Sequence, residues 1–139
     1  MNARYLLDTN IISEPLRAVP DQRVIDNMKI NEGKTVLCSP VLHELRYGME
    51  RLPESKKKAL IRAYIDTVIM PSLPILPYAS EAAVIHAGLR AKLEAKGQTT
   101  GYVDSQIASI AMVNNLTLVT RNIKDFENIE GLKVEDWFS

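Results

Sequence analysis

Short apolar segments alternate with longer helical segments along this chain, and this alternation constrains the fold more than any other feature. Buried strands that are separated by helices are typical of a parallel sheet with helices on both faces. The connections between such strands are expected to be right-handed. We therefore predict an α/β fold with strands at 5–7, 35–38, within 72–78, at 116–120 and from 134, and helices over 41–52, 54–70, 80–97 and 102–114.

Length and composition fit one domain that spans residues 1–139. Apolar residues make up 46% of the chain, which argues against a disordered protein. No apolar run approaches the ~20 residues of a membrane helix, and Asp8 interrupts the first apolar segment too early for a signal peptide. Cys38 is the single cysteine, which excludes an intrachain disulfide and suits a reducing compartment. We expect a cytoplasmic protein with no membrane partner.

The charge balance limits how the chain can bind a polyanion. Lys+Arg and Asp+Glu each number 17, so the formal net charge is 17 − 17 = 0. A neutral protein needs a local basic patch or a metal ion to hold nucleic acid. The densest basic cluster is Lys56-Lys57-Lys58 with Arg51 and Arg62 nearby. The ordinary interpretation of this cluster is a solvated helix face, and the alternative is a contact with an RNA backbone or a partner.

The first candidate acid is Asp8, which directly follows the apolar segment 5–7. Ligand sites of parallel α/β sheets form beyond the carboxyl ends of the strands, so this position favours a functional role. An Asp at this position can equally be the N-cap of the next helix. Thr9 and Asn10 follow it and can hydrogen-bond the carboxylate or cap that helix. Position alone leaves both interpretations open.

The second candidate acid is Glu44, in the predicted helix 41–52. It lies three residues after Val41 and four before Gly48, so we expect it to share the buried side of that helix. A buried carboxylate without a partner is costly, and it needs a cation or several hydrogen-bond donors. Taken by itself, an ion pair with Arg46 or another basic residue is the simpler interpretation.

Two later segments place polar side chains near the same predicted edge of the sheet. Asp104 lies in the first turn of the predicted helix 102–114, where the helix macrodipole commonly stabilises an acid. Asn122 and Asp125 follow the predicted strand 116–120. Their structural interpretation is the exposed start of a short helix.

The combination of acids is harder to explain by structure alone. Asp8, Glu44 and Asp104 come from distant segments, yet all three are predicted at one edge of one sheet. Neighbouring carboxylates raise each other's pKa unless a cation neutralises them. Oxygen-only ligands select hard cations such as Mg²⁺ or Mn²⁺, which often bridge carboxylates to phosphate. These acids therefore suggest hydrolysis of a phosphodiester by water that the cation activates.

Five segments, in order and over almost the whole chain, resemble the PIN-domain family. The resemblance is to the VapC-type toxins of bacterial toxin–antitoxin pairs and to their FitB-like relatives. Each segment is a weak signal alone, and the five together are specific. They are 5–10 (YLLDTN), 41–48 (VLHELRYG), 104–111 (DSQIASIA), 116–126 (LTLVTRNIKDF) and 131–137 (GLKVEDW).

The resemblance implies a three-layer α/β/α sandwich with a central parallel sheet and an endoribonuclease activity that depends on Mg²⁺ or Mn²⁺. It assigns Asp8, Glu44 and Asp104 to the acidic metal site. It also implies a cognate antitoxin, whose C-terminal segment would lie in the acidic groove, and a homodimer. DNA would be contacted only through the antitoxin. The RNA substrate would be a transfer or ribosomal RNA.

One position departs from the family pattern. The family often has a fourth acid directly after the Thr-Arg pair, and this chain has Asn122 there. Asn122 can donate a hydrogen bond to a carboxylate or a metal-bound water but brings no charge, and Asp125 is the nearest acid that could substitute. Whether one or two metals bind therefore stays open. Thr9 and Thr120 would orient the acids or ordered water.

Two other classes of function compete with the nuclease. A PIN fold without its fourth acid could act mainly as a binding module, as the antitoxin's partner in a DNA-bound complex that represses its own promoter. An aspartate-based phosphatase fits poorly, because Asn10 stands where a second acid would follow Asp8. A receiver-like domain also fits poorly, because Thr120 is followed by Arg121 rather than by a lysine.

Overall fold

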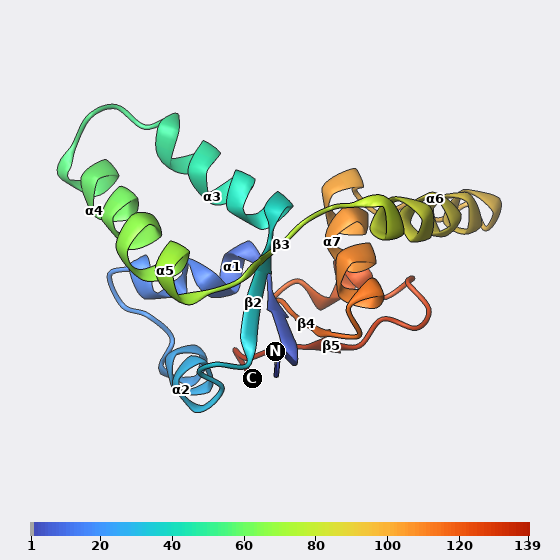
Figure 1. Ribbon diagram of the computed structural model, residues 1–139, viewed down its shortest axis with the longest axis horizontal. Coiled ribbons are helices and arrows are strands. Elements are labelled where there is room, and N and C mark those ends of the chain that lie inside the picture. Colours follow the sequence, from blue (N-terminus) through green and yellow to red (C-terminus); the bar gives the residue numbers. More distant parts are fainter. Residues whose placement is uncertain (1) are drawn as a thin grey trace.

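The computed structural model describes residues 2–139 and has five parallel strands in one sheet, in the order β3-β2-β1-β4-β5 (Figure 1). Leu6 pairs with Val36 on one side and with Leu118 on the other, and all three are almost completely buried. The strands are β1 (Tyr5–Leu7), β2 (Thr35–Cys38), β3 (Ile75–Leu76), β4 (Thr117–Val119) and β5 (Val134–Glu135). Because helices cover both faces of the sheet, the strands are largely apolar segments in which polar and apolar residues do not alternate.

Helices cover both faces of the sheet. Figure 1 shows α1 to α5 on one side of the strands and α6 and α7 on the other. The predicted three-layer arrangement is therefore confirmed. The α-helices are α1 (Thr9–Ile12), α2 (Gln22–Ile30), α3 (Ser39–Glu50), α4 (Lys56–Tyr64), α5 (Met70–Ser72), α6 (Ser80–Ala95) and α7 (Tyr102–Val113), and two 3₁₀ turns are η1 (Glu14–Leu16) and η3 (Ile123–Phe126).

The helix predicted over 54–70 is interrupted. Between α4 and α5 the chain forms a π-helical turn, η2 (Ile65–Ile69). Pro71, the second residue of α5, has no N–H to continue an α-helical ladder, which accounts for the changed hydrogen-bond pattern in the turn before it. The turn keeps Ile65 and Ile69 fully buried.

The loop from α7 into β4 sets where β4 begins. Asn115 has a φ of 53°, in the left-handed region. The N–H of Leu116 donates to the Ala111 carbonyl at 2.9 Å, and the N–H of Asn115 donates to the Met112 carbonyl at 3.2 Å. These two bonds form a Schellman motif, which ends α7 and returns the chain to the sheet.

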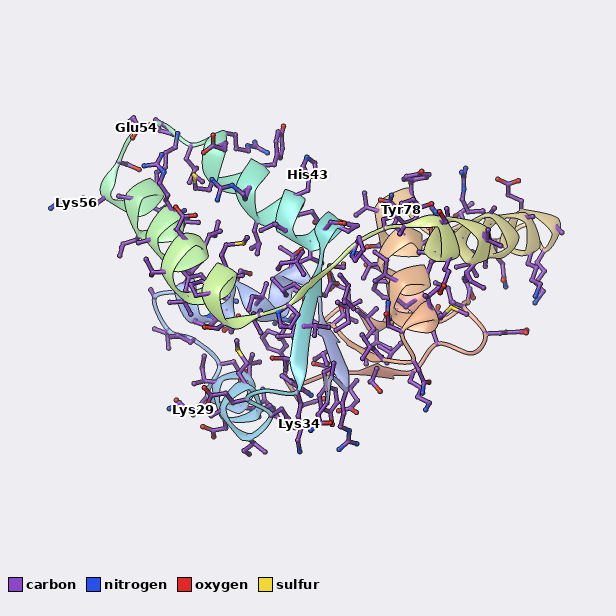
Figure 2. All side chains as sticks on the ribbon, in the orientation of Figure 1. Lys29, Lys34, His43, Glu54, Lys56 and Tyr78 are labelled. Atoms are coloured by element: carbon purple, nitrogen blue, oxygen red, sulfur yellow. The ribbon has the colours of Figure 1, made fainter. Side chains whose placement is uncertain are left out.

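One member of the predicted basic cluster is not available to a ligand. Lys58 is buried, and its Nζ donates to the carbonyls of Glu50 at 3.2 Å and Leu52 at 3.0 Å and lies 3.2 Å from a Glu54 carboxylate oxygen. The ammonium thereby satisfies carbonyls at the end of α3. Lys56 remains exposed and extends from the molecule in Figure 2.

Within residues 2–139, every helix is too short or too polar to cross a membrane.

Candidate active site

Asp8 ends β1 and is held by two hydrogen bonds. The N–H of Thr9 donates to Oδ1 at 2.8 Å, and the hydroxyl of Thr120 donates to Oδ2 at 2.8 Å. Asp8 is thus the N-cap of α1, as the structural interpretation predicts, and it also lies at the carboxyl edge of the sheet. Burial raises the pKa of Asp8 most, the two hydrogen bonds lower it, and the charge of Asp125 raises it further.

Thr120 connects the first and fourth strands at this edge. It is fully buried, and its Oγ1 accepts hydrogen bonds from the Asn122 N–H at 3.1 Å and from the Asn10 amide at 3.4 Å. Asn10 Oδ1 accepts in turn from the N–H of Arg121 at 3.1 Å. Asn10 therefore ties α1 to the loop after β4. The sequence did not predict this role, because it suggested Asn10 only as a partner of the Asp8 carboxylate or as a helix cap.

The predicted orientation of Glu44 is wrong. The buried stripe of α3 consists of Val41, Leu45 and Met49, at a spacing of four residues, whereas Glu44 is exposed. At about 100° per residue, Glu44 lies about 60° from Val41 around the helix, at the border of the buried stripe. Gly48, used to place Glu44 on the buried side, is itself exposed.

The expected ion pair of Glu44 with Arg46 does not form. Arg46 pairs instead with Asp66 at 3.0 Å, and among residues 2–139 no cation forms an ion pair with Glu44. Partial burial raises the pKa of Glu44 most, and the charges of Asp8 and Asp104 raise it further. A free carboxylate that is destabilised by two others can accept a cation without breaking an existing pair.

Asp104 is half-buried in the first turn of α7. Its pKa is raised to about 6, first by burial and then by the charges of Asp8 and Asp125. A position in the first helical turn favours the ionised form. Burial and the neighbouring acids outweigh that preference, so the structural interpretation alone does not account for Asp104.

A buried hydrogen-bonded chain fixes the turn that carries Asp104. The Ser105 hydroxyl donates to the Gly101 carbonyl at 3.0 Å and lies 2.7 Å from His86 Nε2, while His86 Nδ1 lies 2.7 Å from the Tyr78 hydroxyl. Because Ser105 donates to a carbonyl, it accepts from Nε2–H, which leaves Nδ1 to accept from Tyr78. Burial lowers the pKa of His86, which agrees with the neutral imidazole that these hydrogen bonds require.

Asn122 and Asp125 follow β4 as predicted. Both are exposed, and Asn122 directly precedes η3, as the structural interpretation expects. Asp125, within η3, nevertheless adds negative potential at Asp8 and Asp104. The structure thus brings Asp125 into the electrostatic neighbourhood of the acids, while Asn122 adds no charge.

The donor set fits a hard divalent cation. The charges of Asp8 and Asp104 raise the pKa of Glu44 beyond the effect of burial. The hydroxyl of Thr9 is buried without a hydrogen-bond partner in the described chain, and it lies close enough to Glu44 to lower the pKa of that acid. Burial raises the pKa of the nearby Cys38 thiol to about 12, so it stays protonated and the available ligands are oxygens. Across residues 2–139, no three acidic, His or Cys side chains are already arranged to coordinate one ion directly.

Known proteins are similar to this chain in sequence and in fold. The PIN domain family matches residues 5–132. The chain is 33% identical over 136 residues to the tRNA(fMet)-specific endonuclease VapC of Shigella flexneri, covering 96% of this chain and 98% of that protein. It is 34% identical over 126 residues to Toxin FitB of Neisseria gonorrhoeae, covering 87% and 89%.

A solved structure of a related protein has the same fold as this chain. VapBC2 from Rickettsia felis, bound to a DNA fragment from its promoter, matches with a TM-score of 0.82 and 35% identity over 96% of this chain and 98% of that chain. The match extends over the whole sheet and its helices rather than over one motif. On sequence and fold together, the chain belongs to the PIN-domain family, among the relatives of VapC and FitB.

Proposed function

We propose that this chain is a metal-dependent endoribonuclease, built as one PIN-like domain over residues 1–139, and the toxin of a type II toxin–antitoxin pair. The observation that carries the proposal is that acids from separate elements meet at one edge of the sheet. Beyond the effect of burial, the charges of Asp8 and Asp104 raise the pKa of Glu44, and the charges of Asp8 and Asp125 raise the pKa of Asp104. Carboxylates that are destabilised in this way fit a shared cation. The endonuclease and toxin relatives supply the reaction class.

Asp8, Glu44 and Asp104 would hold Mg²⁺, with Mn²⁺ as a substitute, in part through water, since Mg²⁺ retains several waters in protein sites. When bound, the cation would lower the pKa of a coordinated water and offset charge on a phosphate oxygen. The hydroxyl of Thr9, buried without a partner in the described chain, can hydrogen-bond such a water.

The surrounding residues orient the acids. Thr120 and the Thr9 N–H fix both oxygens of Asp8, so that carboxylate is in place before a substrate arrives. Asp125 takes the role of the missing fourth acid, supported by its effect on the pKa values of Asp8 and Asp104. Asn122 contributes hydrogen bonding without charge.

We also propose the partners of the pair. The substrate is RNA, of the transfer or ribosomal class, and an antitoxin binds the chain and supplies the DNA contact. The chain acts in the cytoplasm as a homodimer. The exposed apolar side chains of Val84 and Ile85 on α6 support an apolar contact face for a second copy.

Cleavage of RNA by the purified chain tests the proposal. We expect cutting with Mn²⁺ or Mg²⁺, none with EDTA, and none with Asp8→Asn, which keeps the shape of the side chain and an acceptor for the Thr9 N–H. Asp26→Asn on the exposed side of α2 is the matched control and should cut like the wild type. An Asp8→Asn variant that cuts as fast as the wild type would contradict the assignment.

The second candidate function is a binding module that acts mainly through its antitoxin. The absence of charge at Asn122 favours it. Silence of the folded wild-type chain with every divalent metal tested, together with antitoxin binding, would support the module and exclude the enzyme.

A further inference from the structure

An aromatic stripe runs along the exposed side of α3. It consists of His43, Tyr47 and Arg51, spaced four residues apart and all exposed. The rings of His43 and Tyr47 are stacked, with centroids 6.1 Å apart and planes at 25°, and the Arg51 guanidinium carbon lies 5.8 Å from the centre of the Tyr47 ring. Figure 2 shows His43 on the outer side of α3, pointing away from the sheet. We call these three residues the α3 stripe.

The α3 stripe borders the proposed metal site. His43 precedes Glu44 directly, and Tyr47 follows Glu44 by about one helical turn. Glu44 therefore lies between the buried stripe of α3 and the α3 stripe. Gly48 leaves open space beside them, because a Cβ built there would meet no atom within 4 Å. The Tyr47 ring is therefore within reach of a polymer that is bound at Glu44.

A second exposed tyrosine lies on the helix that carries Asp104. Tyr102 precedes Asp104 by two residues and is 54% exposed, and Arg90 lies 5.1 Å from the centre of its ring. Tyr47, the counterpart near Glu44, is 59% exposed. Each of the two helices that bring an acid to the site thus also carries an exposed tyrosine with an arginine against its ring.

We propose that the α3 stripe is a base-stacking site for single-stranded RNA, an inference that rests on the proposed ribonuclease function. Every base offers a face to an aromatic ring, and arginine adds cation–π and phosphate contacts, so this pairing is typical of single-strand binding. Paired bases are stacked on each other and cannot use such a platform. The stripe therefore selects unpaired nucleotides next to Glu44.

The charge balance of the chain favours stacking as a source of affinity. The chain is neutral overall, and Lys58 is bound to its own backbone. Figure 2 places Lys29 and Lys34 at the other end of the molecule from His43. Because the chain carries no net positive charge, we expect stacking to supply much of the affinity, and that part should depend weakly on salt compared with binding through many phosphate contacts.

Binding of a labelled oligouridylate of about 12 nucleotides, within the span of known single-strand grooves, tests the inference. Fluorescence anisotropy with the full chain in EDTA separates binding from cleavage. We expect Tyr47→Ala to weaken binding roughly 5- to 150-fold, the range for loss of one stacked base. Tyr47→Phe keeps the ring and should bind like the wild type. Leu60→Ala, at an exposed residue of α4, is the control.

The outcomes separate this inference from the proposed function. A perfectly paired RNA hairpin should bind the wild type and Tyr47→Ala equally. Equal binding of single-stranded RNA by these two proteins would overturn the inference even if the wild type cleaves RNA. Loss of antitoxin binding without loss of RNA binding would assign the α3 stripe to a protein partner and overturn it as well. Stacking without metal-dependent cleavage would leave the inference standing and remove the nuclease.

Discussion

At the scale of single residues, the site depends on hydrogen bonds that hold acids where their charge is unfavourable. Asp8 is 7% exposed, and hydrogen bonds from the Thr120 hydroxyl and the Thr9 N–H offset the loss of hydration of its carboxylate. Thr120 has no solvent contact that could replace its own partners. We therefore expect removal of the Thr120 hydroxyl to lower the stability of the fold and to weaken metal binding.

Thr120→Val removes that hydroxyl and keeps the shape of the side chain. We expect a loss of about 1–3 kcal/mol in the free energy of unfolding, because Asp8 and the Asn122 N–H lose a buried partner. Urea denaturation measures the loss. Thr120→Ser keeps the hydroxyl and should stay close to the wild type. Equal stability of Thr120→Val and Thr120→Ser would show that the hydroxyl is not needed.

The raised pKa of Asp104 predicts a pH dependence of stability. Folding raises this pKa from 3.8 to about 6, so the folded chain holds the proton more tightly than the unfolded chain. This contribution is present below about pH 4 and is lost as the pH rises through about 6. In EDTA, Asp104→Asn should therefore gain stability relative to the wild type between about pH 4 and about pH 7. A stability difference that stays constant over this range would contradict the shift.

The end of a strand predicted the position of Asp8, and the start of a helix predicted the position of Asp104. Helical spacing did not predict the orientation of Glu44. Sequence spacing placed Glu44 with Val41 and Gly48, and a glycine does not show which side of a helix is buried. The side is set by the elements that pack on α3, and these come from distant parts of the chain. Ion pairs are equally hard to predict from neighbouring residues, since Arg46 pairs with Asp66, twenty residues away.

At the scale of elements, Lys58 holds the end of α3 next to the start of α4. Lys58→Met keeps the length of the side chain and leaves the carbonyls of Glu50 and Leu52 without this donor. We expect a loss of about 1–3 kcal/mol in the free energy of unfolding. Lys57→Met, at the exposed neighbour, should change it by less than about 0.5 kcal/mol. Thermal or urea unfolding of both variants checks the difference, and equal losses would remove the capping role.

The element pattern was largely predictable because each strand is a short apolar segment next to a turn. The exception is the region from α4 to α5, where the sequence predicts one continuous helix over 54–70. A π-helical turn depends on packing against the rest of the molecule, and Tyr64 beside it donates to the Ile12 carbonyl at 2.7 Å. Contacts of this range leave no local signal in the sequence.

At the scale of the whole molecule, the parallel sheet explains why distant segments share one site. The carboxyl ends of β1 and β4 carry Asp8 and Thr120, and α3 begins where β2 ends and brings Glu44. The first turn of α7, in the other layer, adds Asp104 (Figure 1). Each segment thus contributes one polar group to an edge where their charges interact.

Binding of Mn²⁺ by the metal-free chain, measured by isothermal titration calorimetry near pH 7.5, tests the shared cation most directly. We predict that Asp8→Asn, Glu44→Gln and Asp104→Asn each weaken binding by at least about tenfold, because every one removes a charge from the same site. Asp26→Asn should bind like the wild type. Three folded variants that bind Mn²⁺ as tightly as the wild type, or a wild type that binds none, would contradict the account.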